Sequence, residues 1–322
     1  MKTIKVTPND DLQRILDSIT CPTTIYMTSG TYRQKLWVKC DGVKIVGEDR
    51  ETTRIVWDDY AKKPHPDGRE YNTFRTYTLC ITGEGVTLEN LTVENSNTAP
   101  EKVGQCVALS VNAKRFHAAN VKLVSTQDTL YTAPFPDDLV IRYSGLTDDA
   151  TYYDGFIPKE QLYMEGESVQ IYEKCTICGT VDFIFGGAEA YFYDCDIISL
   201  GDRRKCGYVA APSHSLKQER GYAFINCRFA DGGADKGTIY LARPWRDFGK
   251  CDFIDCTVGE HVSPLLFDKW NDTFRDKTAR FAFCNLVGGE FAPVCWSKEL
   301  TRAEADNIIE CFRARKRSFN VQ

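Results

Sequence analysis

Short hydrophobic runs separated by polar breaks make up the first quarter of the chain. The runs are rich in Val, Ile and aromatic residues, and the breaks contain Gly, Asp or charged residues. This alternation is typical of short β-strands joined by turns. The pattern predicts strands at 24–27, 36–38, 43–47 and 53–57, followed by a polar excursion over 58–75.

A degenerate repeat follows these strands. Each copy begins and ends on apolar residues and carries Asn or Cys near its centre, as seen at 88–93, 172–177, 192–197, 224–229, 253–258 and 281–286. The later copies recur every 28 to 32 residues, counted from Cys195 through Cys227 and Cys256 to Cys284. Short strands in repeats of this size predict a solenoid.

The repeat favours an all-β fold, a right-handed parallel β-helix that forms a single domain over residues 1–322. We expect small Cys and Asn side chains to stack at one inward position of successive coils. A doubly wound α/β fold is disfavoured because the segments between strands lack helical periodicity. A β-sandwich is harder to exclude from the pattern alone.

Helical periodicity is confined to the two ends of the chain. Apolar residues at helical spacing predict a helix over about 9–19, with Asn9 or Asp10 as its N-cap. Thr301 opens a capping-box sequence that predicts a helix over about 301–314. Because a solenoid needs its end coils covered, we expect both to be short capping helices, with a simple appendage as the alternative.

The composition narrows the range of partners. The net charge is −5 and basic residues are spread along the chain, which argues against nucleic-acid binding. No apolar run is long enough to span a membrane, so we expect no membrane partner. No heptad pattern suggests a dimer, and we expect a monomer.

Fourteen cysteines bear on the compartment and on metal binding. Since the N-terminal residues lack a signal-peptide run, we expect reduced, mostly buried thiols and a cytoplasmic location, or secretion if an export signal has been removed. Cys175-x-x-Cys178 is the one CxxC, and no second ligand pair accompanies it. We therefore expect no metal site.

Asp182 stands in an apolar run, 179–186, that is bracketed by glycines. An ionised carboxylate there is unfavourable unless another group pairs with it, or unless it points to solvent from a strand. Three other stretches carry polar groups beside strand-like runs: 104–109, 125–131 and 241–246. In a parallel solenoid all four stretches can lie on one face.

The polar groups in these stretches have complementary chemistry. The amides of Gln105 and Gln127 can donate to an oxygen that becomes negative, and two carboxyls, Asp128 and Asp182, can divide nucleophile and acid roles. Arg243 can hold one carboxylate ionised. Each residue also has an ordinary alternative: Gln105 on a strand surface, Gln127 and Asp128 in a turn, Arg243 in a surface ion pair.

Four motifs in this order resemble those of the pectin methylesterase (pectinesterase) family: Gln-x-Val-Ala-Leu, Gln-Asp-Thr-Leu-Tyr, Asp-Phe-Ile-Phe-Gly and Arg-Pro-Trp. The resemblance covers about residues 25–270. It implies a right-handed parallel β-helix that hydrolyses galacturonate methyl esters, in pectin (homogalacturonan) or its oligomers, to carboxylate and methanol. It implies no cofactor.

The resemblance also implies residue roles. Asp182 would be the nucleophile that forms an acyl-enzyme, and Asp128 would be the general acid and then the base. Gln105 and Gln127 would stabilise the oxyanion, and Arg243 would hold Asp182 charged. The residues expected to line the substrate groove are Trp245, Phe185, Val181, Tyr131 and Phe156.

The chain departs from the family pattern in four places. Asp128 and Asp182 are 54 positions apart, farther than in the plain pattern, and the added segment resembles the longer loop of a bacterial branch. We expect it to lie beside the groove. Ala242 replaces Gly before the arginine, where a positive φ would be strained. Gln34 occupies the position of an early Glu in the family pattern, and Cys106 occupies the position of an Ala.

The sequence also bears on four other functions. A serine esterase lacks support, because no Gly-x-Ser-x-Gly is present and no histidine has triad-like context (His65, His117, His214 and His261). A pectate lyase would want a calcium-binding acidic cluster. A non-catalytic carbohydrate-binding β-helix would not need both aspartates and both glutamines. A related esterase or thioesterase with another acyl substrate stays open.

Overall fold

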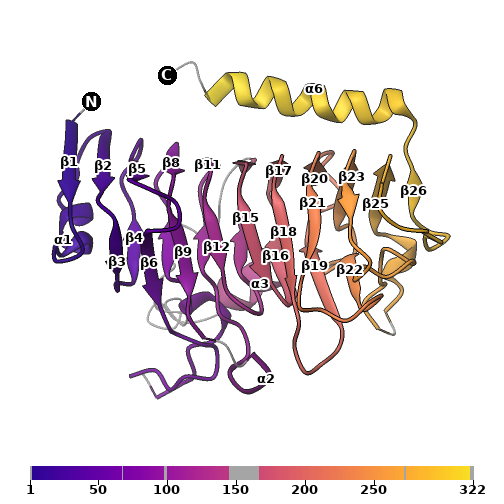
Figure 1. The fold of residues 1–322 in the computed structure, drawn as a ribbon, viewed down its shortest axis with the longest axis horizontal. Coiled ribbons are helices and arrows are strands. Elements are labelled where there is room, and N and C mark those ends of the chain that lie inside the picture. Colours follow the sequence, from indigo (N-terminus) through magenta and orange to yellow (C-terminus); the bar gives the residue numbers. More distant parts are fainter. Residues whose placement is uncertain (1, 67, 98–99, 145–166, 272, 320–322) are drawn as a thin grey trace.

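Three parallel sheets wind around a common axis in this chain (Figure 1). The structure, a computed structural model, describes residues 2–66, 68–97, 100–144, 167–271 and 273–319. Each ladder joins a strand to its counterpart one coil further along, and every ladder between named strands is parallel, as between β11 (Arg115–Ala119) and β14 (Val169–Glu173). The fold is the expected right-handed parallel β-helix.

The strands of the described residues form sheets A, B and C, with eleven, eight and seven strands. Sheet A contains β1 (Lys2–Val6), β2 (Thr23–Met27), β5 (Lys44–Gly47), β8 (Val86–Glu89), β11, β14, β17 (Glu189–Tyr193), β20 (Tyr222–Ile225), β23 (Lys250–Ile254), β25 (Arg280–Cys284) and β26 (Lys298–Glu299). Sheet B contains β3 (Gly30–Tyr32), β6 (Thr53–Trp57), β9 (Thr92–Asn95), β12 (Lys122–Val124), β15 (Thr176–Gly179), β18 (Asp196–Leu200), β21 (Arg228–Gly232) and β24 (Thr257–Val258). Sheet C contains β4 (Leu36–Val38), β7 (Leu79–Ile81), β10 (Leu109–Val111), β13 (Leu130–Thr132), β16 (Val181–Gly186), β19 (Gly207–Pro212) and β22 (Ile239–Ala242).

A one-residue turn repeats between sheets A and B. Its φ is between 53° and 55° in seven coils, at Asn90, Asn120, Lys174, Asp194, Asn226, Asp255 and Asn285. Asn and Asp tolerate this left-handed conformation better than other non-glycine residues, which explains their recurrence. Side chains also bond from coil to coil, since Asn120 donates to Asn90 (2.8 Å) and Asn285 to Asp255 (2.8 Å).

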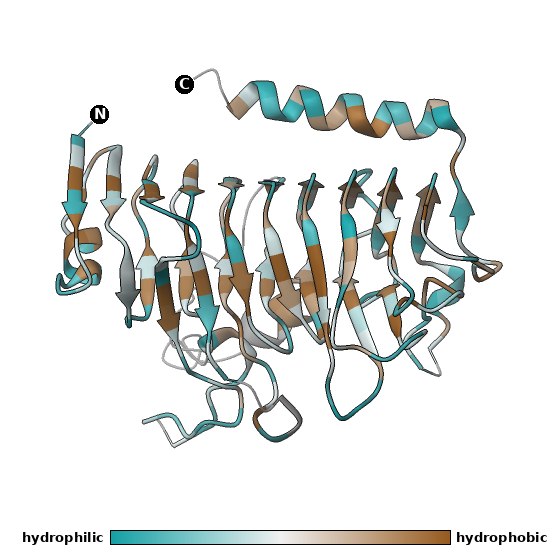
Figure 2. Cartoon of the chain, viewed as in Figure 1, coloured by the Kyte–Doolittle hydropathy of each residue, from teal (hydrophilic) through white to brown (hydrophobic). Residues whose placement is uncertain are grey.

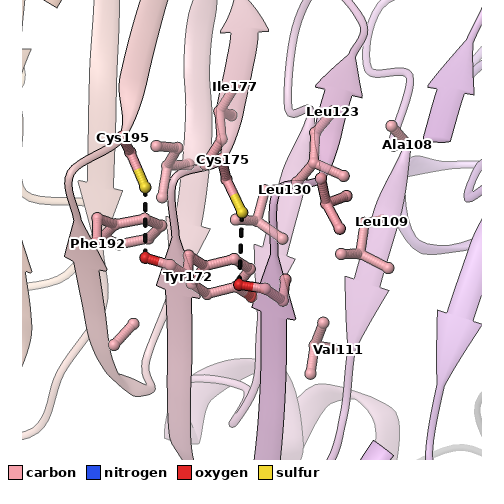
Figure 3. Close-up of a cluster of buried hydrophobic side chains, with 14 of the residues drawn as sticks. Ala108, Leu109, Val111, Leu123, Leu130, Tyr172, Cys175, Ile177, Phe192 and Cys195 are labelled. Atoms are coloured by element: carbon pink, nitrogen blue, oxygen red, sulfur yellow. Dashed lines mark hydrogen bonds between the residues drawn. The ribbon is translucent and has the colours of Figure 1, made fainter. Parts of the chain in front are cut away.

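The residue after this turn points into the core. Cys175, Cys195, Cys227 and Cys256 occupy it in successive coils, and each thiol donates to a carbonyl of the preceding coil, as Cys195 does to Tyr172 (3.3 Å; Figure 3). This confirms the stacked inward cysteines. The prediction that asparagines share this inward position is wrong, because Asn90, Asn120, Asn226 and Asn285 occupy the turn itself. Cys284 does not belong to the stack, because in its coil the turn residue is Asn285, and the thiol faces the outside of sheet A.

Aromatic rings fill the core beside the thiols. The rings of Tyr172, Phe192, Phe224 and Phe253 stack with centroids 4.9, 4.5 and 4.9 Å apart. One hydrophobic cluster extends from Val6 to Phe281 along the coil. In Figure 2 hydrophobic residues concentrate in the strands, whereas the long loops beyond them are mostly hydrophilic.

The N-terminal helix covers the first coil. It is shorter than expected, α1 (Leu12–Asp17), and its N-cap is Asp11, whose side chain accepts from Arg14 N; neither Asn9 nor Asp10 caps it. Asp10 instead accepts from Thr7. The Gln13 side chain bonds both the N–H and the C=O of Trp37 in β4, and so pairs the edge of sheet C.

The C-terminal helix is longer than expected and lies elsewhere. The capping box forms, since Thr301 N donates to Glu304 (2.9 Å), and α6 runs over Arg302–Phe319. It lies along the outer side of sheet A (Figure 1) rather than across the last coil, because Ile308 and Phe312 pack on outward residues of β14 to β25. The last coil is covered by the segment 286–296 instead, which packs on the main core.

Short helices lie in the loops: α2 (Pro100–Val103), α3 (Asp137–Ser144), η1 (Thr73–Arg75) and η3 (Arg275–Lys277). All 14 cysteines are free thiols. Within the described part of the chain, no helix has the length and hydrophobicity needed to cross a membrane.

Candidate active site

Sheet C brings the four polar stretches together on its outer side. Main-chain hydrogen bonds join them coil by coil: Cys106 N to Gln127 O (3.0 Å) and Asp128 N to Val181 O (3.1 Å). Strand order β10-β13-β16-β19-β22 then places the Arg243 segment two strands from β16. Residues up to 138 positions apart in the sequence (105 to 243) therefore converge.

A β-bulge presents Asp182 on this outer side. Val181 pairs with Tyr208, but Ile184 pairs with Ala210, so β16 has one extra residue at this point. Asp182 has φ 50°, and both Phe183 and Ile184 turn into the core. The bulge explains how an aspartate fits in an apolar run, because it breaks the strand alternation and turns one side chain away from the core.

Two glycines bracket the bulge and make room for it. A Cβ on Gly179 would lie 2.2 Å from Cβ of Phe183, and a Cβ on Gly186, with φ 127°, would lie 1.9 Å from the carbonyl oxygen of Thr132. Neither position can hold a larger residue without a shift of the main chain.

Arg243 donates two hydrogen bonds to Asp182. Its Nε donates to Oδ1 (2.7 Å) and its Nη2 to Oδ2 (2.6 Å), and both side chains are almost buried. The guanidinium carbon lies 3.7 Å from the Tyr208 ring centroid and 3.9 Å from that of Trp270, so the planar group lies between two rings. This bidentate, stacked geometry fixes the direction of the Asp182 carboxylate.

Asp128 is also buried and has φ 63°. Burial raises the pKa of Asp128 well above its usual value, the charge of Asp182 raises it further, and Arg243 opposes the rise. Burial raises the pKa of Asp182 as well, but the hydrogen bonds from Arg243 oppose it directly. The environment therefore favours one protonated and one ionised carboxyl, as an acid and a nucleophile require.

The two glutamines flank the carboxyls. Gln105 and Gln127 are half-buried and lie in neighbouring coils. Gln127 Oε1 accepts from Arg204 Nη1 (2.8 Å). Arg204 comes from the turn between β18 and β19, and sequence reasoning missed it, as it missed Tyr208 and Trp270. No local motif marks these three residues, because only the coil stacking brings them to the site.

The residues expected to line a groove lie at different depths. Trp245 is half-buried and its ring contacts Phe185 (5.6 Å between centroids), which contacts Tyr131 (5.1 Å). Tyr131 is fully buried, Phe185 is 3% exposed and Val181 is 5% exposed, so none of the three is an open groove wall. Tyr131 and Phe185 belong to the hydrophobic cluster on which Trp245 packs, and they form an aromatic floor beneath it. Phe156 lies outside the described residues.

The described start of the added segment lies beside Trp245. In α3, Leu139 and Val140 pack on the cluster that holds Phe185, and Asp138 accepts two hydrogen bonds from Arg246 (2.6 and 2.7 Å). This places residues 137–140 next to the aromatic floor. The remainder, 145–166, lies outside the described residues.

Three departures from the family pattern have structural explanations. Ala242 is a buried β22 residue without a positive φ, so its methyl packs in the core. Gln34 bonds both Leu12 N (2.9 Å) and Asp10 O (2.8 Å), and a carboxylate could only accept. Burial raises the pKa of the Cys106 thiol to about 12, which makes it a poor nucleophile.

Two of the four histidines bond residues outside the site. His117 bonds Glu173 (2.9 Å), and buried His214 bonds the carbonyl of Ala188 (2.9 Å). Burial lowers the pKa of His214 to about 3. These contacts give no support to a serine–histidine mechanism.

Comparisons with known proteins identify the family of this chain. A model of the pectinesterase family matches residues 3–135 and 147–292. Pectinesterase 31 of Arabidopsis thaliana is 28% identical over 92% of this chain and 86% of its own length. Pectinesterase QRT1 of the same plant is 27% identical over 94% of this chain and 72% of its own length.

Solved structures share the fold. The pectin methylesterase from Erwinia chrysanthemi aligns with a TM-score of 0.75 at 21% identity, covering 95% of this chain and 94% of that one. A pectin methylesterase in complex with a hexasaccharide aligns with a TM-score of 0.73 at 22% identity, covering 90% and 88%. With the family match spanning most of its length, the chain belongs to the pectinesterase family of carboxylic ester hydrolases.

Proposed function

We propose that this protein hydrolyses the methyl esters of galacturonate residues in homogalacturonan or its oligomers, with Asp182 as the nucleophile. The proposal rests on two buried carboxyls in different environments. Asp182 accepts two hydrogen bonds from Arg243, and Asp128 accepts none from it. This is the arrangement that divides nucleophile and acid roles between two aspartates.

The first half-reaction forms an acyl-enzyme. An Oδ of Asp182 attacks the ester carbonyl carbon, and the tetrahedral oxyanion accepts hydrogen bonds from the amides of Gln105 and Gln127. The C–O bond to the methoxy group then breaks, and Asp128 gives its proton to the leaving oxygen. The products are methanol and an anhydride between Asp182 and the galacturonate.

The second half-reaction restores the enzyme. Asp128, now ionised, takes a proton from water as the water attacks the anhydride. The C–O bond to Asp182 breaks, which leaves Asp182 ionised against Arg243 and releases galacturonic acid, and this acid loses its remaining proton to solvent to become the carboxylate. Asp128 holds the proton needed for the next cycle.

The sugar chain is proposed to lie over Trp245. Flat sugar faces pack on exposed indole rings, and Trp245 stands on an aromatic floor beside Asp182. The likeness to a pectin methylesterase that holds a hexasaccharide supports a site for several sugar units.

Methanol release tests the proposal. Wild-type protein and the Asp182→Asn variant are incubated with highly methylated homogalacturonan in the presence of a chelator. We expect methanol from the wild type and a loss of at least about 10³-fold in the variant, because the nucleophile is removed. The Asp194→Asn variant, which alters an exposed carboxyl in a turn between sheets A and B, is the matched control.

A folded wild type that releases no methanol would contradict the pectin substrate, and other esters and thioesters would then be assayed. Methanol from both wild type and Asp182→Asn would contradict the nucleophile. A product with an unsaturated sugar end would instead support a lyase.

We further propose that the protein acts as a monomer in a reducing compartment on short methylated oligogalacturonates. Fourteen free thiols support this compartment. Higher turnover per ester on short oligomers than on polymer is expected, and equal turnover would count against it. Light scattering of the purified protein tests the monomer.

A further inference from the structure

Arg204 connects the oxyanion residue Gln127 to two other segments. Its Nη1 donates to Gln127 Oε1 (2.8 Å), its Nη2 to Thr180 Oγ1 (3.2 Å), and its Nε to Asp202 Oδ2 (2.8 Å). Gln127 and Thr180 lie in neighbouring coils, each one residue or two before a catalytic aspartate. Arg204 therefore bridges both aspartate-bearing segments.

The bridge sets the direction of the Gln127 amide. A guanidinium only donates, so its partner is the amide oxygen, and the NH₂ group points away from Arg204. Because the amide oxygen is bonded to Arg204, the NH₂ group is the end left to donate to another oxygen. Flipping the amide would place NH₂ against the guanidinium and lose this bond.

Arg204 is itself held in place. Its backbone N–H donates to Asp202 Oδ1 (2.7 Å), and its side chain forks onto Asp202 Oδ2 through Nε and Nη2. The Asp202 side chain is 7% exposed. A buried carboxylate that bonds both the main chain and the guanidinium restricts the rotamers of Arg204.

We propose that Arg204 is a positioning residue that holds the Gln127 amide with its NH₂ group towards the oxyanion of the reacting ester. The inference rests on the proposed function, because Gln127 acts there as an oxyanion donor. It predicts that Arg204 acts through Gln127 and not by binding the substrate.

Steady-state kinetics of Arg204→Met tests this. Methionine keeps much of the side-chain length and removes every donor. We expect kcat to fall by roughly 10- to 100-fold, below the full loss of an oxyanion donor, with KM changed little. Arg203→Met is the matched control: it removes the same charge from the same turn, and Arg203 has no hydrogen bond or ion pair with the described residues. A raised KM with unchanged kcat would overturn the proposal.

A double-mutant cycle isolates the coupling. If Arg204 acts through Gln127, then Arg204→Met should change kcat little in a Gln127→Leu background. Equal losses in both backgrounds would overturn the proposal and favour a direct effect of the charge. Arg204→Lys separates action through Gln127 from a direct effect of the charge, because it keeps the charge and loses the forked hydrogen bonds of the guanidinium. We expect this variant to have a reduced kcat, and full activity would contradict the proposal.

A readout without activity keeps the inference testable if the wild type proves inactive on pectin. The side-chain NH₂ signals of Gln127 in a ¹⁵N spectrum are assigned by their loss in Gln127→Leu. Arg204→Met should shift them towards free-amide positions and speed their exchange, whereas Arg203→Met should not. Unchanged Gln127 signals in Arg204→Met would overturn the proposal whatever the substrate.

Discussion

At the scale of single residues, the site depends on two aspartates that the main chain holds in unusual conformations. Asp128 and Asp182 both have positive φ, and both are buried. Burial works against ionisation of both, and only Asp182 has the two hydrogen bonds of Arg243 to offset it. The asymmetry between two chemically identical side chains therefore comes from one arginine.

This asymmetry predicts the pH dependence of kcat/KM. Activity should rise as Asp182 ionises and fall as Asp128 loses its proton, which gives a bell-shaped profile. In Arg243→Met the pKa of Asp182 should rise, because the opposing charge is gone, and the acid limb should move to higher pH. Arg246→Met, whose arginine pairs with Asp138, is the control. An acid limb that stays in place in Arg243→Met would contradict the assignment.

Compared with a neutral side chain, Asp128 should also lower the free energy of unfolding at neutral pH. Its folded pKa lies above the unfolded value of 3.8, so the folded state binds the proton more tightly. The favourable contribution of Asp128 protonation to the free energy of unfolding is fully present below the unfolded pKa. It is lost as the pH rises through the folded pKa. Asp128→Asn should therefore melt at a higher temperature than wild type at neutral pH, and the difference should shrink as the pH falls towards the unfolded pKa. An equal or lower melting temperature at neutral pH would contradict this.

At the scale of elements, each coil repeats the same few local solutions. In seven coils a left-handed turn residue follows the strand of sheet A, and a small thiol or an aliphatic residue comes next. In four successive coils an aromatic ring of sheet A stacks on its neighbours. Because neighbouring coils share these positions, the side chains form ladders whose hydrogen bonds and ring contacts run along the axis.

Lys174 is the exception among the turn residues and marks a weak point. It has φ 53° where the other six turns have Asn or Asp, and its side chain is exposed. Lys174→Asn should stabilise the fold by roughly 1 kcal/mol, since asparagine tolerates this conformation better. Chemical denaturation measures the change.

The reverse substitution serves as the control for that prediction. Asn226→Lys places lysine in an equivalent turn with φ 54°, and it should destabilise the fold by a similar amount. If Lys174→Asn left the free energy of unfolding unchanged or lowered it, the claim that lysine strains the main chain at this turn would be contradicted.

At the scale of the whole molecule, the active site and the C-terminal helix occupy different sides of the coil. The site lies outside sheet C, whereas α6 crosses the outside of sheet A (Figure 1). Ion pairs fasten the helix at both ends, Arg302 with Asp255 (2.8 Å) and Lys316 with Glu173 (2.5 Å). The helix protects outward apolar residues of sheet A from water.

Phe312 should be the main apolar anchor of that helix. Its ring lies 5.0 Å from that of Tyr193 and 5.6 Å from that of Tyr191. Phe312→Ala should destabilise the protein by about 3 kcal/mol and leave kcat unchanged where the protein is folded. Thermal melting and methanol release measure the two effects. Arg313→Ala, on the exposed side of the helix, should change neither. Loss of kcat in folded Phe312→Ala would show that the two sides are coupled.

The sequence by itself determined the repeat and hence the fold. Alternating short strands, turn residues and inward cysteines each depend on neighbours within a few positions, so a local pattern reveals them. The strands at 24–27, 36–38, 43–47 and 53–57 were predicted to within a residue of β2, β4, β5 and β6. The motifs around Asp182 and Asp128, through their resemblance to a known family, also predicted which residues belong together, and the fold brings them to one side of sheet C.

Only the tertiary structure decided how those residues work together. The bulge at Asp182, the rings of Tyr208 and Trp270 around Arg243, and the bridge from Arg204 all join different coils. The side of the solenoid chosen by α6 is likewise set by outward residues of strands far from it in the sequence. Such contacts depend on which coils stack and in what register. A linear pattern of hydrophobic and polar residues does not show which residues of different coils lie close together.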